Sequence, residues 1–103
     1  MNITKRKPVS VGEMLTEEFM KPLQLTQITL AEFMGVSRKT VNELCTNKRT
    51  ITADTALILA KVFGNTPSFW LNLQQRNDIW TVLNTDKRKK RIDLAKPIKN
   101  LAA

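Results

Sequence analysis

The stretch TLAEFMGVSRKTVNEL, residues 29–44, places the end of one helix and the start of the next only a few residues apart. Gly35 can adopt the positive φ with which many helices end, and Ser37 is a preferred N-cap residue. Thr26 is another N-cap residue, shortly before this stretch. The spacing therefore predicts a short helix from Thr26 to Met34, a tight turn, and a second helix that begins after Ser37.

Small and apolar residues stand where two such helices would contact each other. Ala31 leaves room for the second helix to approach, and Val36, Val41 and Leu44 would hold that helix against a core. Counted from Gln27 as the first of twenty residues, alanine is fifth, glycine ninth, valine fifteenth and leucine eighteenth. This agreement favours a unit that places its second helix in the major groove of DNA.

The outward face of the second predicted helix carries hydrogen-bond donors. An arginine can bind guanine O6 and N7 together, and an asparagine can bind adenine N6 and N7. The alternative for Arg38 and Lys39 is a solvated helix face with no partner. Including flanking residues suited to phosphate contacts, the predicted DNA-binding residues are Gln27, Ser37, Arg38, Lys39, Thr40, Asn42, Lys48 and Arg49.

Further helices are predicted by capping residues and by apolar spacing. Ser10 and Glu13 form a capping box, Thr52 precedes a helix that Gly64 ends, and Thr66 precedes a helix. No segment has the length and alternation of a strand, so the sequence predicts an all-α fold. The apolar positions expected to face the core include Val11, Met14, Leu15, Phe19, Ile28, Leu30, Ala31, Met34, Ala56, Leu57, Ala60 and Phe63.

The net charge of +8 is concentrated at the two ends of the chain. Residues 1–10 carry +3 and residues 85–103 carry +5, whereas residues 11–84 hold seven cations and seven anions. We therefore expect a basic N-terminal arm over residues 1–9, a helical domain over residues 10–84, and a basic, weakly ordered tail over residues 85–103. Basic ends are typical of nucleic-acid-binding proteins, and solvated tails without a partner are the alternative.

The inventory of reactive side chains excludes several kinds of chemistry. Cys45 is the single cysteine and histidine is absent, so a disulfide framework, a Cys/His zinc site and histidine-based catalysis are ruled out. We expect Cys45 to be a small buried apolar residue, and we expect no enzyme activity, cofactor, metal or small-molecule substrate. Without a long apolar run or a signal-like N-terminus, a cytoplasmic protein with no membrane contact is expected.

Three segments together resemble the HigA-type (VapI-like) antitoxins of the Xre helix-turn-helix superfamily. They are PVSVGEMLTEEFMKPL, LAEFMGVSRKTVNEL and KRTITADTALILAKVFGNTPSFWLNLQ, and the resemblance covers about residues 8 to 80. It implies a five-helix, lambda-repressor-like DNA-binding domain and a homodimer that binds palindromic operator DNA and represses its own operon. It also implies a partner, a HigB-type toxin that is a ribosome-dependent mRNA interferase. The stretch NTPSFWLNLQ is the most particular part of the match.

This chain departs from the family after the second helix of the unit. The family usually has Asn-Gly-Lys-Arg there, whereas this chain has Thr46, Asn47, Lys48 and Arg49. Asparagine tolerates the left-handed conformation better than most residues, so we expect Asn47 to replace the glycine in that conformation.

The late aromatic segment matches the region where such antitoxins commonly dimerise. The resemblance implies a dimer interface, with burial of all the aromatic side chains in the monomer core as the alternative. An acidic stripe of Glu13, Glu17 and Glu18 would suit a basic toxin, or it is a solvated helix face. The residues assigned to the dimer interface are Phe69, Trp70, Leu73 and Trp80.

Two further functions remain open from the sequence alone. A stand-alone Xre-type transcriptional repressor without a toxin partner would have almost the same sequence features. An interaction module that kept the fold but lost DNA binding is the other alternative.

Overall fold

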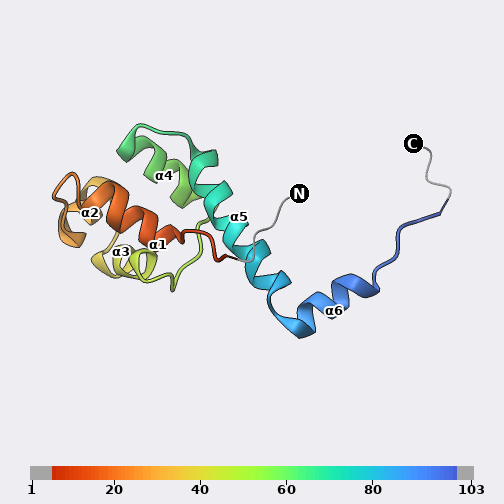
Figure 1. The fold of residues 1–103 in the computed structure, drawn as a ribbon. Coiled ribbons are helices and arrows are strands. Elements are labelled where there is room, and N and C mark those ends of the chain that lie inside the picture. The colour runs from red at the N-terminus through yellow and green to blue at the C-terminus, as the bar shows by residue number, and fades with distance from the viewer. Residues whose placement is uncertain (1–5, 100–103) are drawn as a thin grey trace.

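The computed structural model describes residues 6–99, and over this range the chain is entirely helical and contains no strand (Figure 1). The all-α prediction is therefore confirmed for the described residues. The elements are α1 (Val11–Glu13), η1 (Met14–Met20), α2 (Gln27–Met34), α3 (Arg38–Cys45), α4 (Ala53–Phe63), α5 (Pro67–Leu83) and α6 (Asp86–Leu94).

The helices begin and end where the capping residues predict. In each case a Ser or Thr oxygen accepts a hydrogen bond from the backbone N–H three residues later, which satisfies a donor that the helix itself cannot pair. Gly35 and Gly64 end α2 and α4 with φ values of 69° and 72°. The confirmed N-caps are Ser10, Thr26, Ser37, Thr52 and Thr66.

The first helix differs in form from the one predicted. After α1 it continues as η1, in which backbone hydrogen bonds span five residues rather than four, so the turns are wider. Lys21 N donates to Thr16 O at 3.0 Å, and Leu25 N to Met20 O at 2.9 Å. The sequence predicts a single helix here, and we find no residue in it that accounts for the wider turns.

One hydrophobic core lies among α1, η1 and α2 to α5, and it corrects two predicted positions. Leu57 is 58% exposed and Ile28 is 56% exposed, whereas Leu59 is fully buried. Residues two apart on a helix point in nearly opposite directions, so only the packing of α4 against α5 and α2 decides between Leu57 and Leu59. The apolar spacing alone did not contain that information.

Trp70 lies at the centre of an aromatic cluster within this core. Its ring centroid is 5.0 Å from those of Phe19 and Phe69 and 6.0 Å from that of Phe63, and its indole N–H donates to Asn65 Oδ1 at 3.0 Å.

The buried position of Trp70 corrects part of the predicted dimer interface. Trp70 and Leu73 are buried within a single chain, so neither has surface to offer a second chain and their assignment to an interface is wrong. Phe69 stays 37% exposed, and Trp80 is partly exposed.

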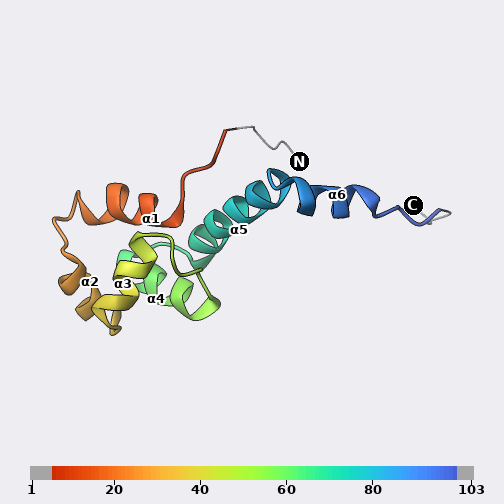
Figure 2. The same ribbon diagram turned by 90° about the horizontal axis from the view of Figure 1, so that it is seen from below.

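The C-terminal region is helical over Asp86–Leu94, so the prediction of a weakly ordered tail is wrong for α6. Helix α6 projects from the far end of α5, contains no buried residue, and gives the chain extents of 54 × 29 × 22 Å (Figure 2). Asp86 in the first turn and a Lys89–Asp93 ion pair at 3.3 Å favour the helix.

The outermost parts of both basic ends, residues 1–5 and 100–103, lie outside the described residues. Within residues 6–99 no helix combines the length and the apolar character needed to cross a membrane.

Candidate nucleic-acid interface

Helix α3 is fixed to the core along one side. Val41 and Leu44 are fully buried, and the small residue Ala31 of α2 is buried at the crossing, as the spacing predicts. Val36 N donates to Ala31 O at 3.1 Å, which closes the turn between the two helices after Gly35. The opposite side of α3 is thereby held outward in a fixed orientation.

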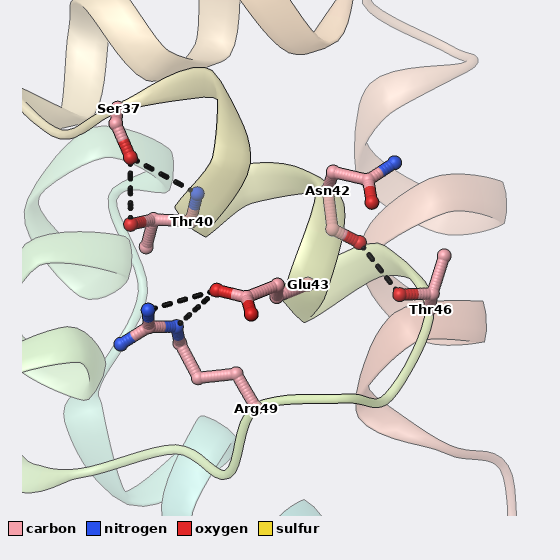
Figure 3. Close-up of polar contacts among 6 residues, drawn as sticks. All are labelled: Ser37, Thr40, Asn42, Glu43, Thr46 and Arg49. Carbon is pink, nitrogen blue, oxygen red and sulfur yellow. Dashed lines mark hydrogen bonds and ion pairs between the residues drawn. The ribbon is translucent and has the colours of Figure 1, made fainter.

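Two hydroxyl groups define the start of α3. Ser37 Oγ accepts a hydrogen bond from Thr40 N at 3.1 Å and lies 3.0 Å from Thr40 Oγ1 (Figure 3). Ser37 and Thr40, both predicted to contact DNA, therefore also contact each other. Ser37 thereby caps the first turn of α3, in which two cations follow the cap.

Arg38 and Lys39 occupy that first turn as exposed side chains. Neither forms a hydrogen bond or an ion pair with any other residue in the range 6–99. Because the N-terminus of a helix is also the positive end of its dipole, the backbone adds to their attraction for an anion. Both cations are thus available to a polyanionic partner.

Asn42 and Gln27 are brought together from two helices. Asn42 Nδ2 donates to Gln27 Oε1 at 3.3 Å, which links the outward face of α3 to the first residue of α2. The main-chain carbonyl of Asn42 accepts from Thr46 Oγ1 at 2.9 Å (Figure 3). The two amides, predicted from the sequence as a base contact and a phosphate contact, form one polar cluster.

The two cations after α3 differ in their surroundings. Arg49 reaches back to Glu43, with Nη2 and Nε at 2.8 and 3.3 Å from the same carboxylate oxygen (Figure 3). Lys48 is exposed and forms no ion pair within residues 6–99. Asn42, which contacts Gln27, and Glu43, which contacts Arg49, are adjacent in α3, so their side chains point about 100° apart around the helix.

Asn47 adopts the left-handed conformation predicted for it, with φ of 59°. Its side chain does more than the sequence indicates, because Oδ1 accepts from Gly12 N at 2.8 Å and Nδ2 donates to Ser10 Oγ at 3.0 Å. It therefore caps the start of α1 from the loop after α3. A Cβ at Gly12 would lie only 2.3 Å from Cys45 O, so glycine is required at this approach.

Cys45 closes α3 as a partly buried residue packed against the core. Burial raises the pKa of its thiol, and a hydrogen bond with Thr16 opposes part of that shift. The Sγ atom lies 3.6 Å from Met20 Sδ. A thiol with a raised pKa is a poor nucleophile at neutral pH, which agrees with the structural role predicted for Cys45.

All eight predicted DNA-binding residues lie on α2, α3, their turn, or the loop after α3. Sequence reasoning missed Glu43 as the partner of Arg49 and Asn47 as the cap of α1. A capping signal at Ser10 was visible, but its second partner comes from 37 residues away in the sequence. Only the folded chain brings that partner into contact.

Comparison with known proteins places this geometry in a family. Residues 17–71, which include α2, the turn and α3, match the helix-turn-helix family HTH_3. Antitoxin HigA-1 of Vibrio cholerae serotype O1 is 52% identical over 84 residues, which are 82% of this chain and 79% of that protein.

Two solved structures resemble the fold closely. An addiction module antidote protein of the HigA family from Coxiella burnetii is 39% identical with a TM-score of 0.81, covering 90% of this chain and 100% of that one. The Pseudomonas aeruginosa antitoxin HigA, solved with the higBA promoter, is 31% identical with a TM-score of 0.80, covering 88% and 98%. The chain therefore belongs to the helix-turn-helix family, among its HigA antitoxins.

Proposed function

We propose that this chain is the antitoxin of a type II toxin-antitoxin module, which binds operator DNA as a dimer and represses its own operon. The observation that carries the DNA-binding part is the pair of exposed cations, Arg38 and Lys39, which form no ion pair within residues 6–99. They lie on a helix that the fully buried Val41 and Leu44 hold against the core. The Vibrio cholerae relative is an antitoxin by name, and the Pseudomonas aeruginosa HigA structure contains promoter DNA. Both support carrying this function to the present chain.

In the proposed complex, α3 is the recognition helix and lies in the major groove. Arg38 donates to a guanine, Asn42 pairs with an adenine, and Lys39 binds a base edge or a phosphate. Ser37 and Thr40 donate to neighbouring acceptors while fixing the helix start. Contacts from the flanks to the DNA backbone set the register, and they come from Gln27, Lys48 and Arg49.

A dimer is proposed because one copy leaves apolar surface exposed. Phe69 and Trp80 remain accessible on α5, and an apolar groove lies between α5 and α6, lined by Ile79, Val82 and Ile92. Burial of such surface against a second copy is favourable. Two copies related by a two-fold axis would place two recognition helices on the half-sites of a palindromic operator.

The DNA-binding part is tested by gel mobility shift with the DNA upstream of the chain's own gene. Wild-type protein should shift this DNA at low salt, and Lys39→Ala should weaken binding by at least about fivefold, because a base or phosphate contact is worth ~1 kcal/mol or more. Lys61→Ala is the matched control, since Lys61 is exposed in the last turn of α4. Equal effects of the two substitutions would contradict the assignment of α3.

The antitoxin part extends the proposal to a partner, a HigB-type mRNA interferase. Co-expression with the product of the adjacent reading frame should relieve the growth arrest that this product causes alone, and the two chains should co-purify. Specific DNA binding without any protective or co-purifying neighbour would instead identify a stand-alone repressor. Absence of a shift at low salt would contradict operator binding and repression, with or without a toxin partner.

A further inference from the structure

Glu43 places a carboxylate on the outward side of the proposed recognition helix. It lies one helical turn after Lys39, so the two side chains share a face, and the fully buried Val41 points the other way. The Glu43 side chain is 26% exposed. An anion at this position would be repelled by the phosphates of a bound duplex unless its charge were balanced.

Arg49 supplies that balance in a particular geometry. Both of its donor contacts end on Glu43 Oε1, at 2.8 Å from Nη2 and 3.3 Å from Nε, and neither uses Oε2 (Figure 3). The carboxylate is thus neutralised and held in orientation through one oxygen. The second oxygen keeps its capacity to accept a hydrogen bond.

A carboxylate can only accept hydrogen bonds, which restricts the bases that it can bind in the major groove. Cytosine presents the N4 amino donor there, whereas guanine presents only acceptors and thymine an acceptor and a methyl group. Adenine presents its N6 donor beside the N7 acceptor, which would face a carboxylate unfavourably. Cytosine is therefore the base that suits an oriented carboxylate oxygen.

We propose that Glu43, held by Arg49, is a specificity-determining residue that binds a cytosine through Oε2 in each operator half-site. This assignment rests on the proposed function, and it gives the Glu43–Arg49 pair a role beyond stability. Exposed ion pairs contribute little to folding. Pairing with Arg49 instead balances the charge of the Glu43 carboxylate and orients it as a hydrogen-bond acceptor among the donor side chains of α3.

The test is a panel of operator duplexes in which every base pair is changed in turn, with binding measured for wild type, Glu43→Ala and Glu43→Gln. Wild type should prefer cytosine at one position of each half-site by roughly 5- to 150-fold. Glu43→Ala should abolish that preference and leave those at other positions unchanged. Glu43→Gln should move the preference toward adenine, because an amide presents both a donor and an acceptor.

Arg49→Ala tests the proposed neutralisation. Arg49→Ala should weaken binding to every duplex, and the loss should be larger when Glu43 is present than in the Glu43→Ala background. Only the protein that keeps Glu43 is left with an unbalanced carboxylate near DNA. An equal loss in both backgrounds would contradict the pairing.

Two results would overturn the cytosine assignment alone. They are a uniform gain in affinity of Glu43→Ala for every duplex, or an unchanged base preference, while wild type still binds the operator. Failure of the wild type to bind any duplex would overturn the proposed function as well. Unfolding midpoints within error of wild type would show that the variants are folded.

Discussion

Helices α3 and α6 are both short cationic helices, of eight and nine residues, but they are attached to the molecule in different ways. Helix α3 has two cations in its first turn, a hydrogen-bonded N-cap, and two fully buried side chains. Helix α6 has five consecutive cations over residues 87–91, no hydrogen-bonded side-chain cap and no buried residue. The helix with less charge is the one that the core holds in place.

This contrast separates attraction to DNA from recognition of DNA. Cations on a projecting helix attract phosphates at any sequence, because the energy comes mainly from counterion release. Recognition of bases requires side chains held in a fixed register, which burial of Val41 and Leu44 gives to α3. We therefore expect α3 to determine where the protein binds and α6 to contribute only to how strongly it binds any DNA.

The largest expected effect comes from removing the attachment of α3 to the core. Leu44→Ala deletes a fully buried side chain and should lower the free energy of unfolding by ~2–5 kcal/mol. The matched change in α6 is Leu94→Ala, at a residue that is 76% exposed, and it should cost less than about 0.5 kcal/mol. Urea unfolding followed by circular dichroism measures both, and similar losses would refute the contrast.

The next largest effect is on sequence preference. Arg38→Ala should weaken operator binding by ~1–3 kcal/mol and relax the preference at one base pair, because a bidentate guanine contact is lost. Arg88→Ala in α6 should weaken operator and random DNA by the same small factor. Fluorescence anisotropy with an operator duplex and a random duplex measures the ratio of the two affinities. A lowered operator-to-random ratio for Arg88→Ala would contradict the view that α6 adds affinity without sequence preference.

The parts of the structure that the sequence predicted are those set by interactions within a few residues. Five N-caps bond to the residue three positions on, Gly35 and Asn47 take the positive φ expected of them, and Gly64 ends α4 as expected. The donor-bearing face of α3 followed from the same local spacing. These features depend on neighbours that are already adjacent in the chain.

The parts that could not be predicted depend on contacts between distant segments. Whether Leu57 or Leu59 is buried depends on how α4 packs, and Trp70 fills the monomer core because Phe19 and Phe63 meet it there. The helical order of α6 was missed because a run of cations also occurs in unfolded tails. The pairing of Arg49 with Glu43 crosses the end of a helix, which periodicity does not describe.

A smaller effect is expected at Asn47, which connects the end of α3 to the start of α1. Asn47→Gly keeps the positive φ but removes both side-chain hydrogen bonds, so it should lower stability by ~1 kcal/mol. Asn47→Ala should cost a further ~1 kcal/mol, because alanine is strained in the left-handed region. Thermal unfolding ranks the three proteins, and Asn47→Ala at least as stable as Asn47→Gly would contradict this account.

The smallest effect concerns Cys45, at the end of the attached helix. Burial raises its pKa, so below the ordinary thiol pKa the folded and unfolded chains are both protonated and Cys45 gives no pH dependence. At higher pH the unfolded thiol ionises first, which favours unfolding, so stability falls as pH rises toward the folded pKa. Urea unfolding at a series of alkaline pH values measures this decline in the free energy of unfolding. In Cys45→Ala the part of the decline that comes from the thiol should be absent.

The same thiol offers a kinetic comparison with α6. In a Cys45→Ala background, Leu94→Cys places a thiol on the projecting helix, where it should react with iodoacetamide as a free thiol does. Cys45 in the wild type should react more slowly at neutral pH, because burial limits both access and ionisation. Equal alkylation rates would mean that the end of α3 opens as readily as α6, and a helix that opens so easily would not hold Arg38 and Asn42 in register on base pairs.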